Sequence, residues 1–189
     1  MINISLKDLA NRFELGTVLF YRPTAKTMYQ AAQSAFQNPE QGTLINCSFR
    51  DIDGCDVSFA DEFVINIQKY IKNYENVVLR LSDCNDAVIE NLQATLAARN
   101  NKDNTKINVL FYKENRYYFL DKLENSLLQT FDYLQDAGDV TARDVALQFE
   151  IEINSASNRL KKLYDTNKLF RKEIIDEIGR QHLYYLHEQ

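Results

Sequence analysis

Hydrophobic and polar positions change period repeatedly along the first 120 residues. Short apolar runs of strand length alternate with segments in which apolar residues recur at helical spacing. The predicted strands cover residues 2–6, 18–21, 44–49, 77–81, 107–112 and 117–120, and the predicted helices cover 24–36, 58–71 and 85–96. Strands that alternate with helices are typical of α/β folds. We therefore predict an α/β domain with a mixed sheet at residues 1–120.

The last third of the chain has another order of signals. Apolar residues at helical spacing predict a helix over 125–136, and Gly138 follows where a C-terminal cap is expected. Thr141 is placed to cap a short second helix. After a turn, Asn154 is a good cap for a third helix, which Asn167 can end in the left-handed conformation.

After Asn167 the helical spacing gives way to strand material. Two apolar runs, 169–175 and 182–186, flank a turn at 176–179 that contains Gly179. This arrangement predicts a β-hairpin. We predict a second domain at residues 121–189.

Basic residues are concentrated in one window of the C-terminal third of the chain. The chain carries a net charge of −5, yet the window from Asn154 to Lys172 holds six basic residues and a single acid, Asp165. Affinity for nucleic acids follows local basic patches rather than net charge. The acidic total therefore does not exclude a nucleic-acid partner.

The string TARDVALQFEIEINSASNRLKKLYDTNKLFRKEIIDEIGRQHLYYL resembles a winged helix-turn-helix of bacterial transcriptional regulators. The resemblance implies that the helix matching 154–166 enters the major groove and that the hairpin matching 169–186 is the wing. Short polar side chains at a helix start can reach base edges, and lysine or arginine can neutralise phosphates. The expected DNA-binding residues are Asn154, Ser155, Ser157, Asn158, Arg159, Lys161, Lys162, Lys168, Arg171 and Lys172.

An alternative interpretation of the same residues stays open. Winged helices also serve as protein docking or dimerisation modules, and a basic helix face is often only a solvated surface. The loop from 176 to 180 carries two acids and one base, which weakens the interpretation of its tip as a phosphate contact.

The strings LINCSFRDIDGCDVSFADEFVINI and ENVVLRLSDCNDAVIENLQATL resemble the STAS-like family, relatives of bacterial anti-sigma factor antagonists. In true antagonists a serine or threonine at the helix start is phosphorylated by a partner kinase. Ser58, in SFADEF, is the residue that matches that position, although the Asp-Ser-Ser-Gly motif is absent. Ser58 is either a helix cap with Asp61, worth about 1 kcal/mol, or a phosphosite.

The sequence contains no clear motif for catalysis, phosphate binding by a glycine loop or metal binding. No phosphate-cradling glycine loop is present, no serine or cysteine has a credible histidine partner, and Cys47, Cys55 and Cys84 form no C-x-x-C pair. We expect buried free thiols, no metal, no cofactor and no enzyme. The absence of a long apolar run or signal peptide leads us to expect a cytoplasmic protein that does not enter a membrane.

A cluster of aromatic residues at 111–112 and 117–119 has two interpretations. Exposed rings could stack on bases. In adjacent strands such rings are more often cross-strand core packing, which is the interpretation we favour. The short connection from these strands to the next helix predicts a fixed geometry between the two domains.

Two hypotheses for the function follow. In the first, the chain is a transcriptional regulator that binds double-stranded DNA through the winged helix, as a homodimer if the target has paired half-sites. The STAS-like domain then binds a partner or mediates assembly. In the second, the chain is a partner-switching adaptor that does not bind DNA, and both domains bind protein, for example a regulatory protein or a kinase.

Overall fold

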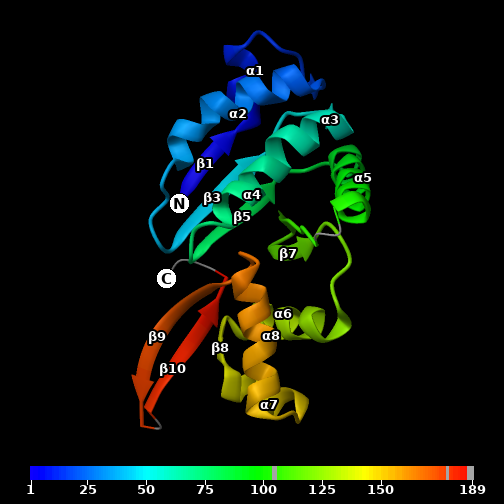
Figure 1. The fold of residues 1–189 in the computed structure, drawn as a ribbon. Coiled ribbons are helices and arrows are strands. Elements are labelled where there is room, and N and C mark those ends of the chain that lie inside the picture. Colours follow the sequence, from blue (N-terminus) through cyan, green and yellow to red (C-terminus); the bar gives the residue numbers. More distant parts are fainter. Residues whose placement is uncertain (104–105, 178, 187–189) are drawn as a thin grey trace.

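A mixed five-stranded sheet forms the centre of the N-terminal part of the molecule (Figure 1). The computed structural model describes residues 1–103, 106–177 and 179–186. The strand order is β1-β3-β5-β6-β7, and all neighbours are parallel except β6 and β7. The strands are β1 (Ile2–Ser5), β3 (Thr43–Ser48), β5 (Val77–Ser82), β6 (Leu110–Lys113) and β7 (Arg116–Phe119).

Helices cover one face of this sheet. They are α1 (Leu6–Arg12), α2 (Arg22–Phe36), α3 (Val57–Ala60), the π-helical segment η1 (Asp61–Ile65), α4 (Asn66–Ile71) and α5 (Asp86–Asp103). Their apolar side chains join alternate residues of the central strands, such as Ile45, Leu79 and Leu81, in one buried cluster. Alternation along each strand directs the intervening residues to the opposite face. The predicted α/β class with a mixed sheet is confirmed at this level.

The remaining elements form a smaller layer of helices and strands. They are α6 (Asn125–Ala137), β8 (Asp139–Thr141), α7 (Ala142–Phe149), α8 (Ile153–Asp165), β9 (Phe170–Asp176) and β10 (Gly179–Tyr185). The three strands form an antiparallel sheet in the order β8-β10-β9. Figure 1 shows β9 and β10 extending away from the first layer on one side of α8.

The second face of the central sheet packs against this smaller layer. Leu44, Val78, Leu110 and Tyr117 of the central sheet lie in the same buried cluster as Phe131 of α6 and the apolar face of α8. Tyr117 N–H also donates to Gln135 Oε1 at 2.7 Å, and the rings of Phe119 and Phe131 lie 4.6 Å apart. The core of the C-terminal elements therefore includes part of the central sheet.

Several expectations about individual elements need correction. The first predicted strand ends at Ser5, whose side chain accepts from Asp8 N–H and begins the unexpected helix α1. Helix α2 begins at Arg22 rather than after Thr24, because Pro23 is tolerated in the first turn of a helix. The strand expected at 18–21 is shorter, β2 (Val18–Leu19), and it pairs in parallel with the unexpected strand β4 (Gly54–Cys55). The short strand β8 is also unexpected.

The aromatic residues of β6 and β7 pair across the strands. Phe111 stacks on Tyr118, with ring centroids 5.3 Å apart, and Tyr112 packs beside Tyr117 at 5.0 Å. The Arg80 guanidinium lies over Tyr112, 5.0 Å from the ring centroid. The cross-strand packing that we favoured for these rings is present.

Candidate nucleic-acid interface

Helix α8 lies across the smaller layer and presents one face to solvent. Its buried face consists of Ala156, Leu160, Leu163 and Tyr164. The helix begins at Ile153 with Glu152 as its N-cap, so the prediction that Asn154 is the cap was wrong. Asn154 lies inside the first turn, where its side chain projects outward. The capping predictions at Thr141 and Gly138 are confirmed, and Asp144 completes a capping box with Thr141.

The outward face of the first half of α8 is polar. Asn154, Ser155 and Asn158 are exposed, and Ser157 is half-buried. None of these four side chains makes a hydrogen bond within the part of the chain that the structure describes. Their donors and acceptors are therefore open to an external partner, as direct reading of base edges requires.

The basic residues of the second half of α8 do not form one surface. Lys161 is paired with Asp165 one turn along the same helix. Lys162 Nζ lies 2.9 Å from Glu124 Oε1, at the start of α6, and so faces away from the outward row. Because Glu124 lies 38 residues away from Lys162, the sequence window could not show this neutralising contact.

Lys168 is not on the surface. Only 2% of it is exposed, because Asn167 adopts a left-handed conformation (φ 59°) that turns the chain inward after α8. The expectation that Lys168 contacts DNA is therefore incompatible with its burial in this structure.

Three basic residues, one on α8 and two on β9, pack on aromatic rings. The Arg171 guanidinium lies 4.1 Å from the Tyr164 ring centroid, and Lys172 Nζ lies 5.5 Å from that of Tyr185. Arg159 lies 5.8 Å from the centroid of Phe149. Such contacts fix a cation in place. Arg159 and Arg171 remain suitable for phosphate contacts.

One exposed cation near α8 was missed by sequence reasoning. Arg143, in the first turn of α7, is exposed, and the residue directly after it closes the Thr141 capping box. Arg180 of β10 is also exposed, but it pairs with Glu173 at 3.2 Å. Across 121–189 there are thirteen acids and nine bases, so attraction to phosphate would depend on local geometry rather than on total charge.

Apolar side chains also lie open on this part of the molecule. Leu147 of α7 is 83% exposed, Ile153 at the start of α8 is 51% exposed and Ile175 of β9 is 78% exposed. Single exposed apolar residues are ordinary on protein surfaces. Leu147 and Ile153 flank the turn between α7 and α8, so they border the polar row.

Ser58 lies at the second position of α3, and it is half-buried. The N-cap of α3 is Asp56, whose Oδ1 accepts from Phe59 N–H at 2.6 Å. Asp61 is buried instead between two arginines, with Arg22 at 2.9 Å and Arg99 at 2.7 Å. The expectation that Ser58 caps this helix with Asp61 was wrong, because the residue two positions earlier supplies the acceptor.

The three cysteines lie in or against the buried cluster of the N-terminal layer. Cys47 and Cys55 are buried, Cys84 is half-buried and all three are free thiols. Burial raises the pKa of each thiol, which keeps it protonated and unreactive. Among residues 1–103, 106–177 and 179–186, no three His, Cys, Asp or Glu side chains are grouped so as to hold a metal ion. His187 lies outside the described residues.

The described helices include none that is both long enough and apolar enough to span a lipid bilayer. Comparison of the chain with protein-family models, with curated proteins and with solved structures found no match.

Proposed function

We propose that the chain is a DNA-binding regulator in which the elements from α6 to β10 act as a winged helix and α8 reads the major groove. The observation that carries the proposal is the exposed row of Asn154, Ser155 and Asn158, whose side chains have no partner within the described residues. The antiparallel hairpin of β9 and β10, which lies on one side of α8, supports its role as the wing in this proposal (Figure 1). In this proposal the N-terminal layer is a STAS-like domain that binds a partner or mediates assembly.

The charges around the row define how DNA would be held. Arg143, Arg159 and Arg171 are the cations placed for phosphate contacts, whereas Lys162 and Lys168 are engaged elsewhere. With few phosphate contacts, affinity for mixed-sequence DNA should be weak and should fall with salt by a small slope. Specificity should then rest on the polar row.

The test is fluorescence anisotropy of the full chain with labelled duplex DNA across a salt series. Asn158→Glu places a carboxylate in the outward row, and we expect it to weaken binding about ten-fold or more through repulsion of the DNA. Gln129→Glu is the matched control, because Gln129 is an exposed polar residue on α6, outside the outward row of α8. Equal binding by the wild type and Asn158→Glu would refute the assignment of α8.

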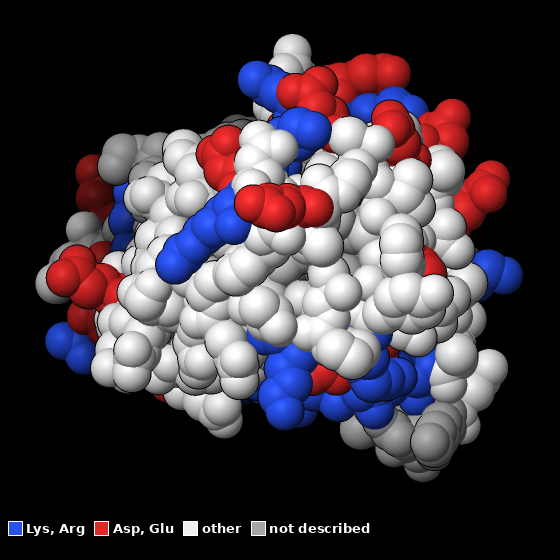
Figure 2. Space-filling view, turned by 90° about the horizontal axis from the view of Figure 1, so that it is seen from above, with Lys and Arg blue, Asp and Glu red and all other residues white. Residues whose placement is uncertain are grey.

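A second candidate function is favoured by a separate observation. Val18, Phe20, Tyr21 and Val57 are exposed apolar residues around β2 and the start of α3. They are held together by pairing of β2 with β4 and by a hydrogen bond from Tyr21 N–H to Asp56 Oδ2 at 3.2 Å. Figure 2, which views the molecule from the α1 end, shows a broad uncharged area with charged side chains around its edges.

This apolar group lies next to Ser58, the candidate phosphosite. In the second candidate function the chain is a partner-switching adaptor, and a regulatory protein or kinase docks beside α3. A phosphate on Ser58 would add negative charge near Asp56 and alter that contact. Absence of DNA binding at low salt, with a partner retained by the wild type and lost by Tyr21→Asp, would favour the adaptor over the regulator. Retention of the same partner by Tyr21→Asp would exclude docking at this surface.

A further inference from the structure

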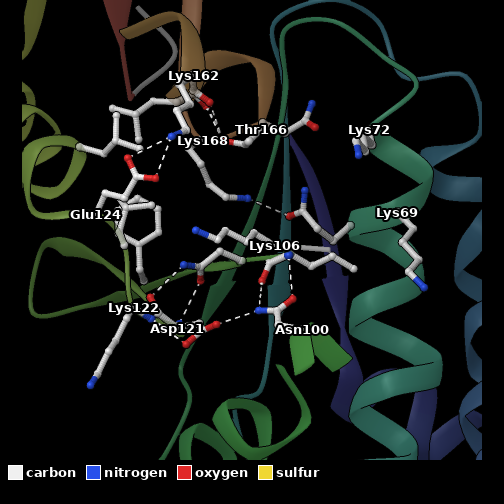
Figure 3. Close-up of a pocket in the computed structure, with 18 of the residues that line it drawn as sticks. Lys69, Lys72, Asn100, Lys106, Asp121, Lys122, Glu124, Lys162, Thr166 and Lys168 are labelled. Atoms are coloured by element: carbon white, nitrogen blue, oxygen red, sulfur yellow. Dashed lines mark hydrogen bonds and ion pairs between the residues drawn. The ribbon is translucent and has the colours of Figure 1, made fainter. Parts of the chain in front are cut away.

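A hollow of about 550 Å³ lies where the two layers of the molecule meet. Its walls come from α4, the last turns of α5, the segment 106–124 and the end of α8 (Figure 3). A volume of this size is typical of sites for small organic molecules. The lining includes six lysines and two acids: Lys69, Lys72, Lys106, Lys122, Lys162, Lys168, Asp121 and Glu124.

Lys168 is the most deeply buried of these lysines. Its Nζ donates to Gln68 Oε1 at 3.3 Å, and Gln68 is itself buried. No acid pairs with Lys168 in the described part of the chain. Burial without a counter-charge lowers the pKa of Lys168 to about 7. An amine in this position has one neutral acceptor and lacks the negative partner that buried cations normally have.

The two acids of the hollow are already engaged. Glu124 pairs with Lys162 at the rim. Asp121 accepts from Asn100 Nδ2 at 2.7 Å and from Lys122 N–H at 2.8 Å. Neither acid therefore compensates Lys168.

Side-chain hydrogen bonds of Asn100 and Asn108 hold one wall of the hollow in place. Asn100 donates to the Ile107 carbonyl at 2.9 Å and accepts from Ile107 N–H at 2.8 Å. Asn108 donates to the Asp121 carbonyl at 2.8 Å and accepts from Asp121 N–H at 3.0 Å. A cavity with an already ordered wall costs little further ordering when a ligand enters it.

Two lysine side chains point into this cavity, and part of its wall is apolar. Figure 3 shows Lys106 and Lys168 directed into the hollow, whereas Lys122 points away from it. Phe119, Leu127 and Leu163 contribute the apolar side. Ligand pockets commonly combine apolar walls with a few convergent polar groups, and lysine is a frequent partner of phosphate.

We propose that this hollow binds a small organic anion of nucleotide size, whose phosphate or carboxylate group lies against Lys168 and Lys106. The apolar part of the ligand then packs against Phe119 and Leu127. Because the walls come from both layers, the bound anion contacts residues of both layers. This site is independent of the outward row of α8, so the inference does not depend on DNA binding.

The test is isothermal titration calorimetry of the full chain at low salt with three probes: adenosine monophosphate, pyrophosphate and citrate. We expect at least one probe to bind. Binding of the two phosphate compounds would indicate recognition of phosphate, and binding of citrate would indicate recognition of carboxylate. Lys168→Met should weaken that binding about ten-fold or more, because a charged hydrogen bond is lost. Lys106→Met, at a solvent-accessible position, should weaken it as well.

Lys26→Met is the matched control, because Lys26 is an exposed lysine on α2 that does not line the hollow. Its affinity for the probe should equal that of the wild type. The proposal is overturned if none of the three probes binds, if both Lys168→Met and Lys106→Met bind as the wild type does, or if Lys26→Met weakens binding equally. The last result would indicate general attraction to a basic surface.

Discussion

At the scale of single residues, Lys168 marks the limit of what the sequence can predict. It belongs to a window of six bases, and its neighbours in the sequence give no sign that it is buried. Burial results from the left-handed turn at Asn167 together with α4, which is about 100 residues away in the chain. Asn167 was predicted to adopt that conformation, but what the turn packs against depends on tertiary structure. The same holds for the pairing of Lys162 with Glu124.

Lys168 should make the stability of the protein depend on pH. Its ammonium is protonated in the unfolded chain up to about pH 10.5 but in the folded chain only up to about pH 7. Between these values the unfolded chain binds one more proton, so the free energy of unfolding rises with pH. Relative to Lys168→Met, the wild type should gain about 2 kcal/mol between pH 7 and pH 9, where each pKa unit is worth about 1.4 kcal/mol.

Urea unfolding of both proteins at the two pH values measures this difference. The free energy of unfolding of Lys168→Met is subtracted from that of the wild type at each pH. This subtraction removes the contributions of other titrating groups, including the lysines and acids that line the same hollow. At pH 6 the methionine variant should be the more stable of the two, because it buries no charge. A difference between the proteins that stays constant from pH 6 to pH 9 would contradict the burial of an uncompensated amine.

At the scale of elements, hydrophobic spacing located most helices and strands but not their ends. Apolar runs such as Val77–Leu81 are long enough to be recognised, whereas β4 and β8 contain two and three residues and carry no periodic signal. The start of α3 was misplaced because Ser58, Asp61 and Asp56 are all plausible capping residues in the sequence. Only the backbone geometry selects Asp56. The outward row of α8 was found because its residues are local to one helix.

The assignment of the α3 cap gives a direct test. Asp56 accepts from Phe59 N–H and from Tyr21 N–H, so Asp56→Ala should lower the free energy of unfolding by about 1 kcal/mol or more. Ser58 makes neither contact, so Ser58→Ala should change it by less than about 0.5 kcal/mol. Chemical denaturation of the two variants provides the comparison. A larger loss from Ser58→Ala than from Asp56→Ala would restore Ser58 as the cap.

At the scale of the whole molecule, the two faces of one sheet hold the layers together. The helices α1 to α5 bury one face, and the elements from α6 to β10 pack on the other through Leu44, Val78, Leu110 and Tyr117. The sequence predicted a division near residue 120 and a fixed geometry between the parts. It could not show the shared core. The sequence around Leu44 and Val78 is equally typical of a strand whose two faces are both covered within one domain.

A shared core should make unfolding cooperative across the division. Differential scanning calorimetry of the full chain should show one transition, with equal calorimetric and van't Hoff enthalpies. Leu44→Ala, which leaves a cavity between the layers, should lower the free energy of unfolding by about 2–4 kcal/mol without splitting that transition. Two separate transitions in the wild-type protein would show that the layers unfold independently.

The contact between the sheet and the C-terminal elements also limits how this architecture can be recombined. A chimera that grafts residues 121–189 onto a foreign domain would leave Phe131 and the apolar face of α8 without the surface formed by Leu44, Val78, Leu110 and Tyr117. The transplanted segment would then expose an apolar patch and tend to aggregate. A successful graft must carry those four positions with it, although they lie on strands β3, β5, β6 and β7 of the donor.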